Sequence, residues 1–539
     1  MSLEEVTVGP PPLCEWIEPA LREIAGQDPL GLQTITTDRI LPGLLPGVLA
    51  LSVRARYFSV YSFLLRHYAR SGAVADNAGL DEFMRQREFE ICVAANLCPR
   101  CDAPSVIGNG VGRPLAASRP GAYERQRSIK TQLGGYGLYY RGPMEELGLV
   151  VRRGQAMVGD TPNPIDLLQK TPRAQQLADL YERSIAGTQW YLKWMNGVDP
   201  VPAEVLEELG HVGCLCRLDE HPDERSAIAD VFLLSPSPER VEPTKHRQRA
   251  FALLLDLATD EPTVLESDSS FRHAVVSTFT TSPLDTDAAG EARARWAAVV
   301  MRESAQDPLA SIWTSFCRAG MAAQPFEGLT SAELDDLVRT RLVAAGVVDF
   351  GSTTITCTPD TPCAVWFEDL RQATADLSWE DIREAAEDTG DALTGLAAFL
   401  VLCARVPDGD AASAAWAEVA RVDGDRQPGL ARMATLVQRR LHLQASVAET
   451  LRWAIDNFIV SVHETVAMRK LPDSTFRFFW EHGRLCFVDN GVWGFDMSGL
   501  RRAALASLAS DLGWWTRDDA DRPGVTDSGR AVISKVFAR

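Results

Sequence analysis

The sequence predicts a mainly α-helical protein of several domains, with short β-hairpins between some of its helices. A length of 539 residues exceeds the size at which a single hydrophobic core stops growing. Apolar residues recur at spacings of three and four in stretches such as "HRQRAFALLLDLA" and "ARARWAAVVMRESAQDPLASIWTSFC", which is the period of an amphipathic helix. By contrast, "TFRFFWEHGRLCFVDNG" alternates with period two and predicts a hairpin around His482–Gly483. We therefore expect a multidomain helical scaffold.

The composition favours a protein of the cytoplasm over a membrane or secreted one. Hydrophobic residues make up 46% and charged residues 24% of the chain, as in ordinary globular proteins. The longest apolar run, "LTGLAAFLVLCARV", is too short and interrupted to span a bilayer. The N-terminus "MSLEEVTVGPPPLCEW" lacks the basic start and apolar stretch of a secretory signal. Eleven scattered cysteines fit reduced thiols better than a disulfide framework. We expect no membrane partner.

Residues 1–110 form the first predicted domain, which is helical. Loops are expected at "GQDPLG" and "LPGLLPG", and helical spacing runs from Arg54 to Arg70 and from Leu80 to Asn96. In "VRARYFSVYSFLLRHYAR" arginines alternate with aromatic residues. We interpret this stretch as an amphipathic helix whose aromatic side chains face the core while its arginines reach solvent.

Residues 111–195 form the second predicted domain and contain a basic stretch in an acidic chain. The whole chain carries a net charge of −19, so any contact with a polyanion requires a local basic patch. Between Gly110 and Gly159 eight basic residues stand against three acidic ones. We expect a helix across "YERQRSIK", a glycine turn, a helix ending at "LGLV", a hairpin-like loop and a final helix. Thr171 is the expected N-cap of that last helix, with Pro172 at its first position.

The C-terminal residues repeat this order. "LRRAALASLASDLGWWTRDDADRPGVTDSGRAVISKVF" contains a helix ending at "DLGWW", a charged loop with a strand on each side, and Thr526 as the N-cap of a final helix. Both segments, near residues 118–190 and 500–539, resemble the winged-helix superfamily, in which a recognition helix runs into a two-stranded wing and then a capped helix. Ala174 stands in the first segment where the second has Gly529.

The remaining segments complete the predicted division of the chain. We expect helical domains at 196–325 and 366–470. Residues 326–365, with "FEGLTSAELDDLVRTRLVAAGVVDFGSTTITCTP", form a third, weaker winged-helix candidate. Residues 471–539 combine the β-hairpin with the C-terminal winged helix.

The winged-helix resemblance implies DNA as a partner of the first copy. In such folds the second helix of the motif enters the major groove and the wing contacts the backbone, which requires basic residues on that face. The expected DNA-binding residues are Arg119, Arg125, Arg127, Lys130, Arg141, Arg152 and Arg153. The last copy carries Asp518, Asp519 and Asp521 in its wing, which would repel phosphate. We therefore expect it to dock another protein subunit, such as a motor ATPase or a nuclease.

Two cysteine pairs form a candidate metal site. Cys98 and Cys101 in "NLCPRCDAP" have the spacing of a zinc knuckle, and Cys214 and Cys216 in "HVGCLCRLDEH" would complete four thiolate ligands, with His211 or His221 as substitutes. Zinc held in this way would be structural, because a closed site leaves no position for substrate. The alternative is that these cysteines are buried thiols packed as small apolar groups.

Catalytic motifs are weak in this sequence. "HETVA" at His463 lacks the second histidine of a zinc-protease helix, and "GNGVG" is not followed by the Lys-Ser or Lys-Thr that meets phosphate. Arg477 and His482 have the spacing of the catalytic pair of HEPN ribonucleases, which they resemble, but that motif belongs on a helix.

The function that the sequence favours is therefore a non-enzymatic, DNA-binding adaptor of a multiprotein machinery. Through "LPGVLALSVRARYFSVYSFLL" and "VHETVAMRKLP" the chain resembles uncharacterised bacterial proteins of genome-defence loci, which implies a role in antiviral defence. The alternatives are a structural subunit that docks only proteins, with a layout similar to kleisins by fold analogy, and a ribonuclease using Arg477 and His482.

Overall fold

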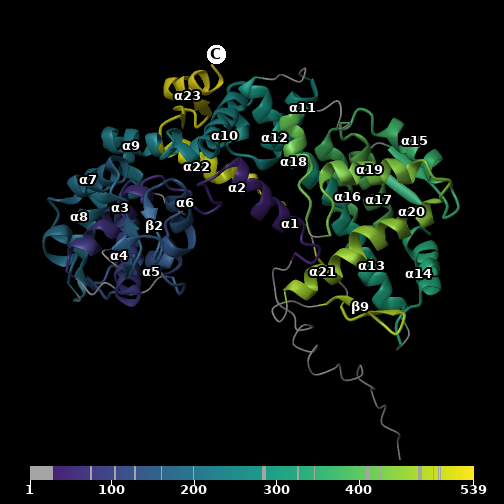
Figure 1. Ribbon diagram of the computed structural model, residues 1–539, viewed down its shortest axis with the longest axis horizontal. Coiled ribbons are helices and arrows are strands. Elements are labelled where there is room, and N and C mark those ends of the chain that lie inside the picture. The colour runs from purple at the N-terminus through teal and green to yellow at the C-terminus, as the bar shows by residue number, and fades with distance from the viewer. Residues whose placement is uncertain are drawn as a thin grey trace, which may run out of the picture. The chain divides into compact units, whose positions relative to one another are not determined.

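In the computed structural model the chain forms two compact units. The structure describes residues 28–538 except 73–75, 102–104, 127–128, 159–160, 198, 282–286, 325–326, 345, 352, 408–412, 425, 471–475, 490, 494, 496 and 498. Unit 1 comprises Met1–Ile40 with Arg272–Ser498, and unit 2 comprises Leu41–Phe271 with Gly499–Arg539. Both units are mainly helical, which confirms the predicted fold class (Figure 1). The predicted domains 1–110, 196–325 and 471–539 each contribute residues to both units.

Unit 1 is a helical assembly with two β-hairpins. Its helices are α1 (Leu32–Thr34), η2 (Ile35–Ile40), α12 (Ala288–Gln306), α13 (Pro308–Ala323), α14 (Ser331–Leu337), η8 (Val338–Leu342), α15 (Cys363–Ala373), α16 (Trp379–Thr389), α17 (Ala392–Ala404), α18 (Ala414–Ala420), α19 (Leu430–Leu441), α20 (Val447–Ala454), η9 (Ile455–Val460) and α21 (Ser461–Arg469). The hairpins are β7 (Val347–Phe350) with β8 (Thr353–Thr356), and β9 (Phe478–Glu481) with β10 (Arg484–Phe487). Helix α11 (Asp268–Thr281) crosses the boundary between the units in the sequence.

Helix α17 forms the centre of unit 1. Asp391 starts it by accepting the backbone N–H groups of Leu393 and Thr394, at 2.9 Å each. All of its residues from Ala392 to Cys403 are buried, as expected for a helix that is apolar on every side. It packs against α12, α13, α15, α16, α19 and α20. The stretch that was too short to span a bilayer is therefore a core helix.

Unit 2 contains more and shorter elements. Its helices are α2 (Leu41–Leu44), α3 (Tyr57–Arg70), α4 (Asn77–Leu97), α5 (Asn109–Ser118), η3 (Tyr136–Tyr140), α6 (Arg141–Glu146), α7 (Pro172–Ile185), η4 (Trp190–Trp194), α8 (Ala203–Gly213), η5 (Leu215–Glu220), α9 (Pro222–Leu233), η6 (Pro238–Arg240), α10 (Val241–Asp260), η7 (Pro262–Leu265), η10 (Gly499–Arg501), α22 (Arg502–Asp511) and α23 (Asp527–Phe537). Its strands form antiparallel pairs: β1 (Ala122–Tyr123) with β6 (Val201–Pro202), β2 (Val150–Val151) with β5 (Leu167–Leu168), β3 (Met157–Val158) with β4 (Thr161–Pro162), and β11 (Trp515–Arg517) with β12 (Pro523–Val525).

Helix α3 lies in the core of unit 2, and two arginines of this stretch are not in solvent as expected. It packs against α7, and the rings of Tyr57 and Tyr61 stack with centroids 5.3 Å apart. Arg56 and Arg66, which were expected to reach solvent, are buried, with exposed fractions of 0% and 5%. Carboxylates keep these cations in the interior: Arg56 pairs with Glu224 at 3.0 Å, and Arg66 pairs with acidic residues of α7. A buried charge is tolerated only with such a partner.

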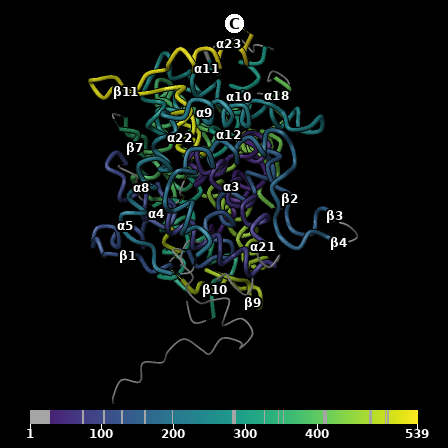
Figure 2. The backbone as a smooth tube through the Cα atoms, turned by 90° about the vertical axis from the view of Figure 1, so that its left-hand side faces the viewer, coloured from purple at the N-terminus to yellow at the C-terminus, as the bar shows by residue number. Residues whose placement is uncertain are grey.

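Three segments show the order helix, hairpin, helix. They are η3–α6 through β2–β5 to α7, α14–η8 through β7–β8 to α15, and α22 through β11–β12 to α23. The two expected N-caps are confirmed: Thr171 Oγ1 accepts the N–H of Ala174, and Thr526 Oγ1 accepts that of Gly529. In the first segment, called here module 1 (residues 136–185), the β3–β4 hairpin stands out at the edge of its unit (Figure 2).

The helix predicted across "YERQRSIK" is not present in the structure. Residues 122–123 form strand β1, and the described residues between 124 and 130 belong to no helix or strand. Helix α4 binds the backbone that follows: Arg85 donates to the carbonyls of Lys130 and Thr131, both at 2.8 Å, and Asp81 accepts the N–H of Leu133. These tertiary contacts replace the hydrogen bonds of a local helix.

The last segment, called here module 2 (residues 502–537), packs against its own unit. α22, β12 and α23 all contact α10. Arg502 pairs with Asp268, and Arg501 donates to the carbonyl of Val48 at 2.7 Å. The two arginines at the start of α22 are therefore structural. Within the described residues, no helix has the length and apolar character needed to cross a membrane.

Candidate functional site

The cysteine pairs are brought together where α4 and α8 end. Cys98 is the C-cap residue of α4 and Cys214 that of α8, each with extended backbone angles that turn the chain away from its helix. The two helices approach closely at Gly210, where an added Cβ would lie 2.4 Å from the carbonyl oxygen of Ala94. Glycine at this position allows the helix ends to meet.

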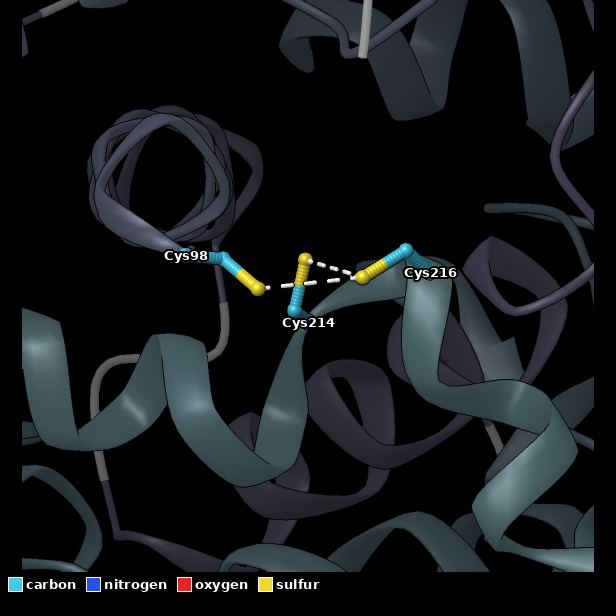
Figure 3. A group of neighbouring side chains, drawn as sticks. All are labelled: Cys98, Cys214 and Cys216. Atoms are coloured by element: carbon cyan, nitrogen blue, oxygen red, sulfur yellow. Dashed lines mark hydrogen bonds between the residues drawn. The ribbon is translucent and has the colours of Figure 1, made fainter. Parts of the chain in front are cut away.

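The thiols of Cys98, Cys214 and Cys216 lie within 4.8 Å of one another. Figure 3 shows them pointing into a common space, with Sγ of Cys216 3.7 Å from that of Cys98 and 3.5 Å from that of Cys214. Cys101 follows in a tight turn, where its N–H donates to the carbonyl of Cys98 at 3.2 Å. Its thiol lies near those of Cys214 and Cys216, which change its pKa. We call these four residues the cysteine cluster.

Two sulfur–sulfur distances among Cys98, Cys214 and Cys216 are close to those of a tetrahedral zinc site. A Zn–S bond of about 2.3 Å gives tetrahedral S···S edges of about 3.8 Å. The two sulfur distances of 3.5 and 3.7 Å lie close to that value. His211 is exposed on α8, and His221 directs Nε2 to the carbonyl of Val212 at 3.3 Å. Neither histidine belongs to the group of side chains that includes Cys98, Cys214 and Cys216.

Hydrogen bonds among the thiols change their acidity. Hydrogen bonding with Cys101 and then Cys214 lowers the pKa of Cys216, whereas hydrogen bonding with Cys101 and then Cys216 raises the pKa of Cys214. Binding of Zn²⁺ would require all four thiols to deprotonate.

Arginines surround the cysteine cluster and fix its backbone. Nη1 of Arg56 donates hydrogen bonds to the carbonyl oxygens of Val212 at 3.2 Å and Cys214 at 2.6 Å. Arg54 pairs with Asp511 at 3.1 Å and lies close enough to Cys101 and Cys214 for a favourable interaction with their thiolates. Cationic neighbours stabilise thiolates, so this shell favours the ionised form that a metal needs.

The expected DNA-binding residues lie in different environments, and three of them form ion pairs with carboxylates. Arg125 is 3% exposed and pairs with the buried Glu90 at 2.8 Å, which corrects its assignment to a DNA face. Arg141 forms a bidentate pair with Asp166, at 2.6 and 2.8 Å. Arg152 pairs with Glu145. A second observation explains Arg125: the carboxylate of Glu90 also accepts from Arg87 and Trp190, so the group is a buried ionic network.

Other members of the predicted set remain on the surface. Arg119, Lys130 and Arg153 are exposed, and Arg127 lies outside the described residues. The outward face of the helix η3–α6 carries a different chemistry, because Leu138 is 45% exposed and Glu145 and Glu146 are half-buried there. Apart from Arg141, which pairs with Asp166, the residues on the outward face of this helix are thus apolar or acidic.

Asp166 organises the base of the hairpin in module 1. Besides Arg141, its carboxylate accepts the backbone N–H of Arg153 at 2.8 Å and the hydroxyl of Tyr136 at 3.0 Å. Sequence reasoning did not single out this residue. The available signal was a lone acidic residue in the apolar run "NPIDLL".

The Arg477–His482 pair is not assembled as a catalytic site. The β9–β10 hairpin predicted around His482–Gly483 is confirmed, and its turn leaves His482 exposed with φ +48°. Arg477 lies at the other end of β9, where it pairs with Asp489 and donates its N–H to Nε2 of His463 at 3.0 Å. Five residues of extended chain separate the two by roughly 15 Å. The hairpin therefore differs from the helix on which the ribonuclease motif belongs, and the guanidinium of Arg477 pairs with Asp489.

No protein-family model, curated protein or solved structure matches this chain.

Proposed function

We propose that this chain is a non-enzymatic adaptor in which a structural zinc ion, bound by Cys98, Cys101, Cys214 and Cys216, braces module 1. The observation that carries this proposal is the S···S spacing of 3.5 and 3.7 Å, close to the edge of a ZnS₄ tetrahedron. Two of the sulfurs belong to buried residues, and the cluster joins chain segments more than 110 residues apart. Four protein ligands would leave no open position for substrate, so the metal would act in folding.

The position of the cluster explains how zinc would support module 1. Helix α4 holds the start of the module, because Glu88 accepts the N–H groups of Gly135 at 2.8 Å and Tyr136 at 2.6 Å. Helix α8 packs against α7, the last helix of the module. A metal that joins the ends of α4 and α8 would therefore fix the module from both sides.

The metal proposal is tested by elemental analysis of the full-length protein purified without chelators. We expect one zinc per chain and its loss in Cys98→Ser and Cys214→Ser. Cys92→Ser is the matched control, since Cys92 is also buried on α4 but bonds to Asn96. Metal-free wild-type protein should bind Co²⁺ with the absorption of a tetrahedral thiolate site. Wild-type protein that binds neither metal would refute the proposal, whether or not the variants fold.

We propose DNA as the partner of module 1, in a bacterial defence complex of the cytoplasm. The supporting observation is that Arg153 in module 1, and Arg119 and Lys130 in the chain before it, are exposed, and exposed cations can contact phosphate. Fluorescence anisotropy with duplex DNA across a salt series tests this. Binding should weaken steeply with salt and should weaken further in Lys130→Glu with Arg153→Glu. Unchanged binding in that variant would remove module 1 from the interface.

The second candidate function is docking of a protein by module 1. Met157 and Val158 in the hairpin are 65% and 52% exposed, and Leu138 is exposed on the preceding helix. Apolar side chains at a projecting tip suit a protein surface better than a phosphate backbone. No DNA binding at low salt, together with a stable complex formed with a neighbouring subunit and lost in Met157→Asp, would favour this candidate.

A further inference from the structure

Unit 1 contains a basic surface that no local stretch of sequence reveals. It surrounds two cavities, one of about 450 Å³ and one of about 210 Å³. Arginines line the first cavity at the ends of α18 and α19, and basic residues from three distant segments line the second. We call the seven residues the unit 1 basic surface: Arg39, Arg421, Arg426, Arg432, Arg439, Arg469 and Lys470.

One loop connects the two cavities. Residues 421–429 join α18 to α19, with Arg421 at the first cavity and Arg426 at the second. The loop is held in place because Arg302 donates to the carbonyl of Val422 at 3.0 Å and Arg39 to that of Asp423 at 2.9 Å. These hydrogen bonds hold the backbone of the loop that carries Arg421 and Arg426.

The local charge is opposite to that of the chain. Acidic residues outnumber basic ones by 73 to 54 in the whole sequence, yet α19 has three arginines and no acidic residue. Among the described residues, the lining of both cavities includes no Asp or Glu. Acidic groups do lie nearby: Asp423 is 3.9 Å from Arg432, Glu464 lies near Arg426, and Asp38 precedes Arg39. They leave the surface with an excess of cations.

Helix α19 presents two of its arginines on its solvent-exposed face. Its buried face consists of Leu430, Met433, Ala434 and Val437, and Arg432 and Arg439 lie on the exposed face. Arg432 is in the first turn, where the helix dipole disfavours a positive charge. Seven residues of helix place the two arginines about 10.5 Å apart along the axis. Four successive phosphates of one strand span about 10 Å along the duplex axis.

From these observations we infer that the unit 1 basic surface binds the sugar–phosphate backbone of a nucleic acid. Arginine suits this role because its planar guanidinium contacts phosphate oxygens in a bidentate manner. Thr435 and Gln438, exposed between the two arginines, add hydrogen-bond donors toward the same strand. The inference is independent of zinc and of module 1, because every residue involved belongs to unit 1.

The test is anisotropy of labelled duplex and single-stranded DNA with the full-length protein. We expect Arg432→Glu with Arg439→Glu to weaken binding at least tenfold at moderate salt. The slope of log affinity against log salt should fall by about 2 for duplex DNA, since each lost phosphate contact removes about 0.9. The control is Arg318→Glu with Arg341→Glu, which makes the same charge change at exposed positions of unit 1 outside both cavities.

The outcomes separate this inference from the proposal for module 1. An equal loss in the control would show a net-charge effect and refute the inference. Loss only in Lys130→Glu with Arg153→Glu would place DNA on module 1 and refute it as well. Binding of acidic polypeptide but not of DNA would also overturn it. If the glutamate variant fails to fold, the neutral pair Arg432→Gln with Arg439→Gln must still lower the salt slope by about 2.

Discussion

The buried ion pair between Arg56 and Glu224 makes a quantitative prediction for unit 2. The two side chains are 0% and 1% exposed. The carboxylate of Glu224 accepts from Nε and Nη2 of Arg56 at 3.2 and 3.0 Å, and from the hydroxyl of Ser59. Replacing Glu224 with glutamine keeps the size of the side chain but removes its charge. The guanidinium of Arg56 would then remain buried without a counter-charge.

The expected cost follows from the burial. Removing one partner of a buried pair costs about 3–5 kcal/mol. Glutamine still offers one acceptor oxygen, so we expect the lower end, about 3 kcal/mol. For a unit of this size, that loss should reduce the melting temperature by roughly 6–12 °C. The matched control is Asp179→Asn, because Asp179 also pairs with an arginine of α3 but is 60% exposed. Exposed pairs contribute at most about 1 kcal/mol.

Differential scanning calorimetry of wild type and both variants measures this difference. Zinc content should fall in Glu224→Gln too, because Arg56 holds the carbonyl of Cys214. A shift no larger than that of Asp179→Asn would refute the reasoning. It would mean that the cation of Arg56 finds solvent or another acceptor in the native state.

Three further predictions concern other parts of the chain. Burial lowers the pKa of His463 to about 4. The neutral ring therefore contributes stability that is fully present above the unfolded pKa of about 6.5 and is lost, by up to about 3 kcal/mol, as pH falls from there through 4. Over this pH range the urea midpoint should drop less in His463→Asn than in the wild type. Gly210→Ala places a Cβ 2.4 Å from the carbonyl of Ala94, so melting temperature and zinc retention should both fall, whereas the unobstructed Gly187→Ala should retain zinc. Thr526→Ala removes the cap of α23 and should cost about 1 kcal/mol in chemical denaturation, unlike the exposed Thr516→Ala.

The sequence predicted the elements whose determinants lie within a few residues. The caps at Thr171 and Thr526 depend on a side chain and an N–H three residues later. The hairpin at His482–Gly483 depends on alternation and a turn that accepts positive φ. Helical periodicity gave the fold class for the same reason, since 3.6 residues per turn place apolar side chains on one face.

The same local reasoning gave the wrong environment for charged side chains. Arg125 was expected on a DNA-binding helix, but Glu90 on α4 holds it in the interior. Arg56 was expected in solvent, but it pairs with Glu224, 168 residues later. The sequence shows that an arginine is present. It does not show which carboxylate will be its neighbour.

The sequence by itself determined that this protein is helical and multidomain, where several helices begin, and that two cysteine pairs are spaced as metal ligands. Only the tertiary structure decided that Cys98, Cys214 and Cys216 share one space and that three of the predicted DNA-binding arginines pair with carboxylates. It also decided that Arg39, Arg432 and Lys470 belong to the surface of one unit. The physical reason is the separation along the sequence of the residues that interact. Caps and periodicity act over three or four residues, whereas thiol clusters, buried ion pairs and charged surfaces depend on packing between helices that are far apart in the chain.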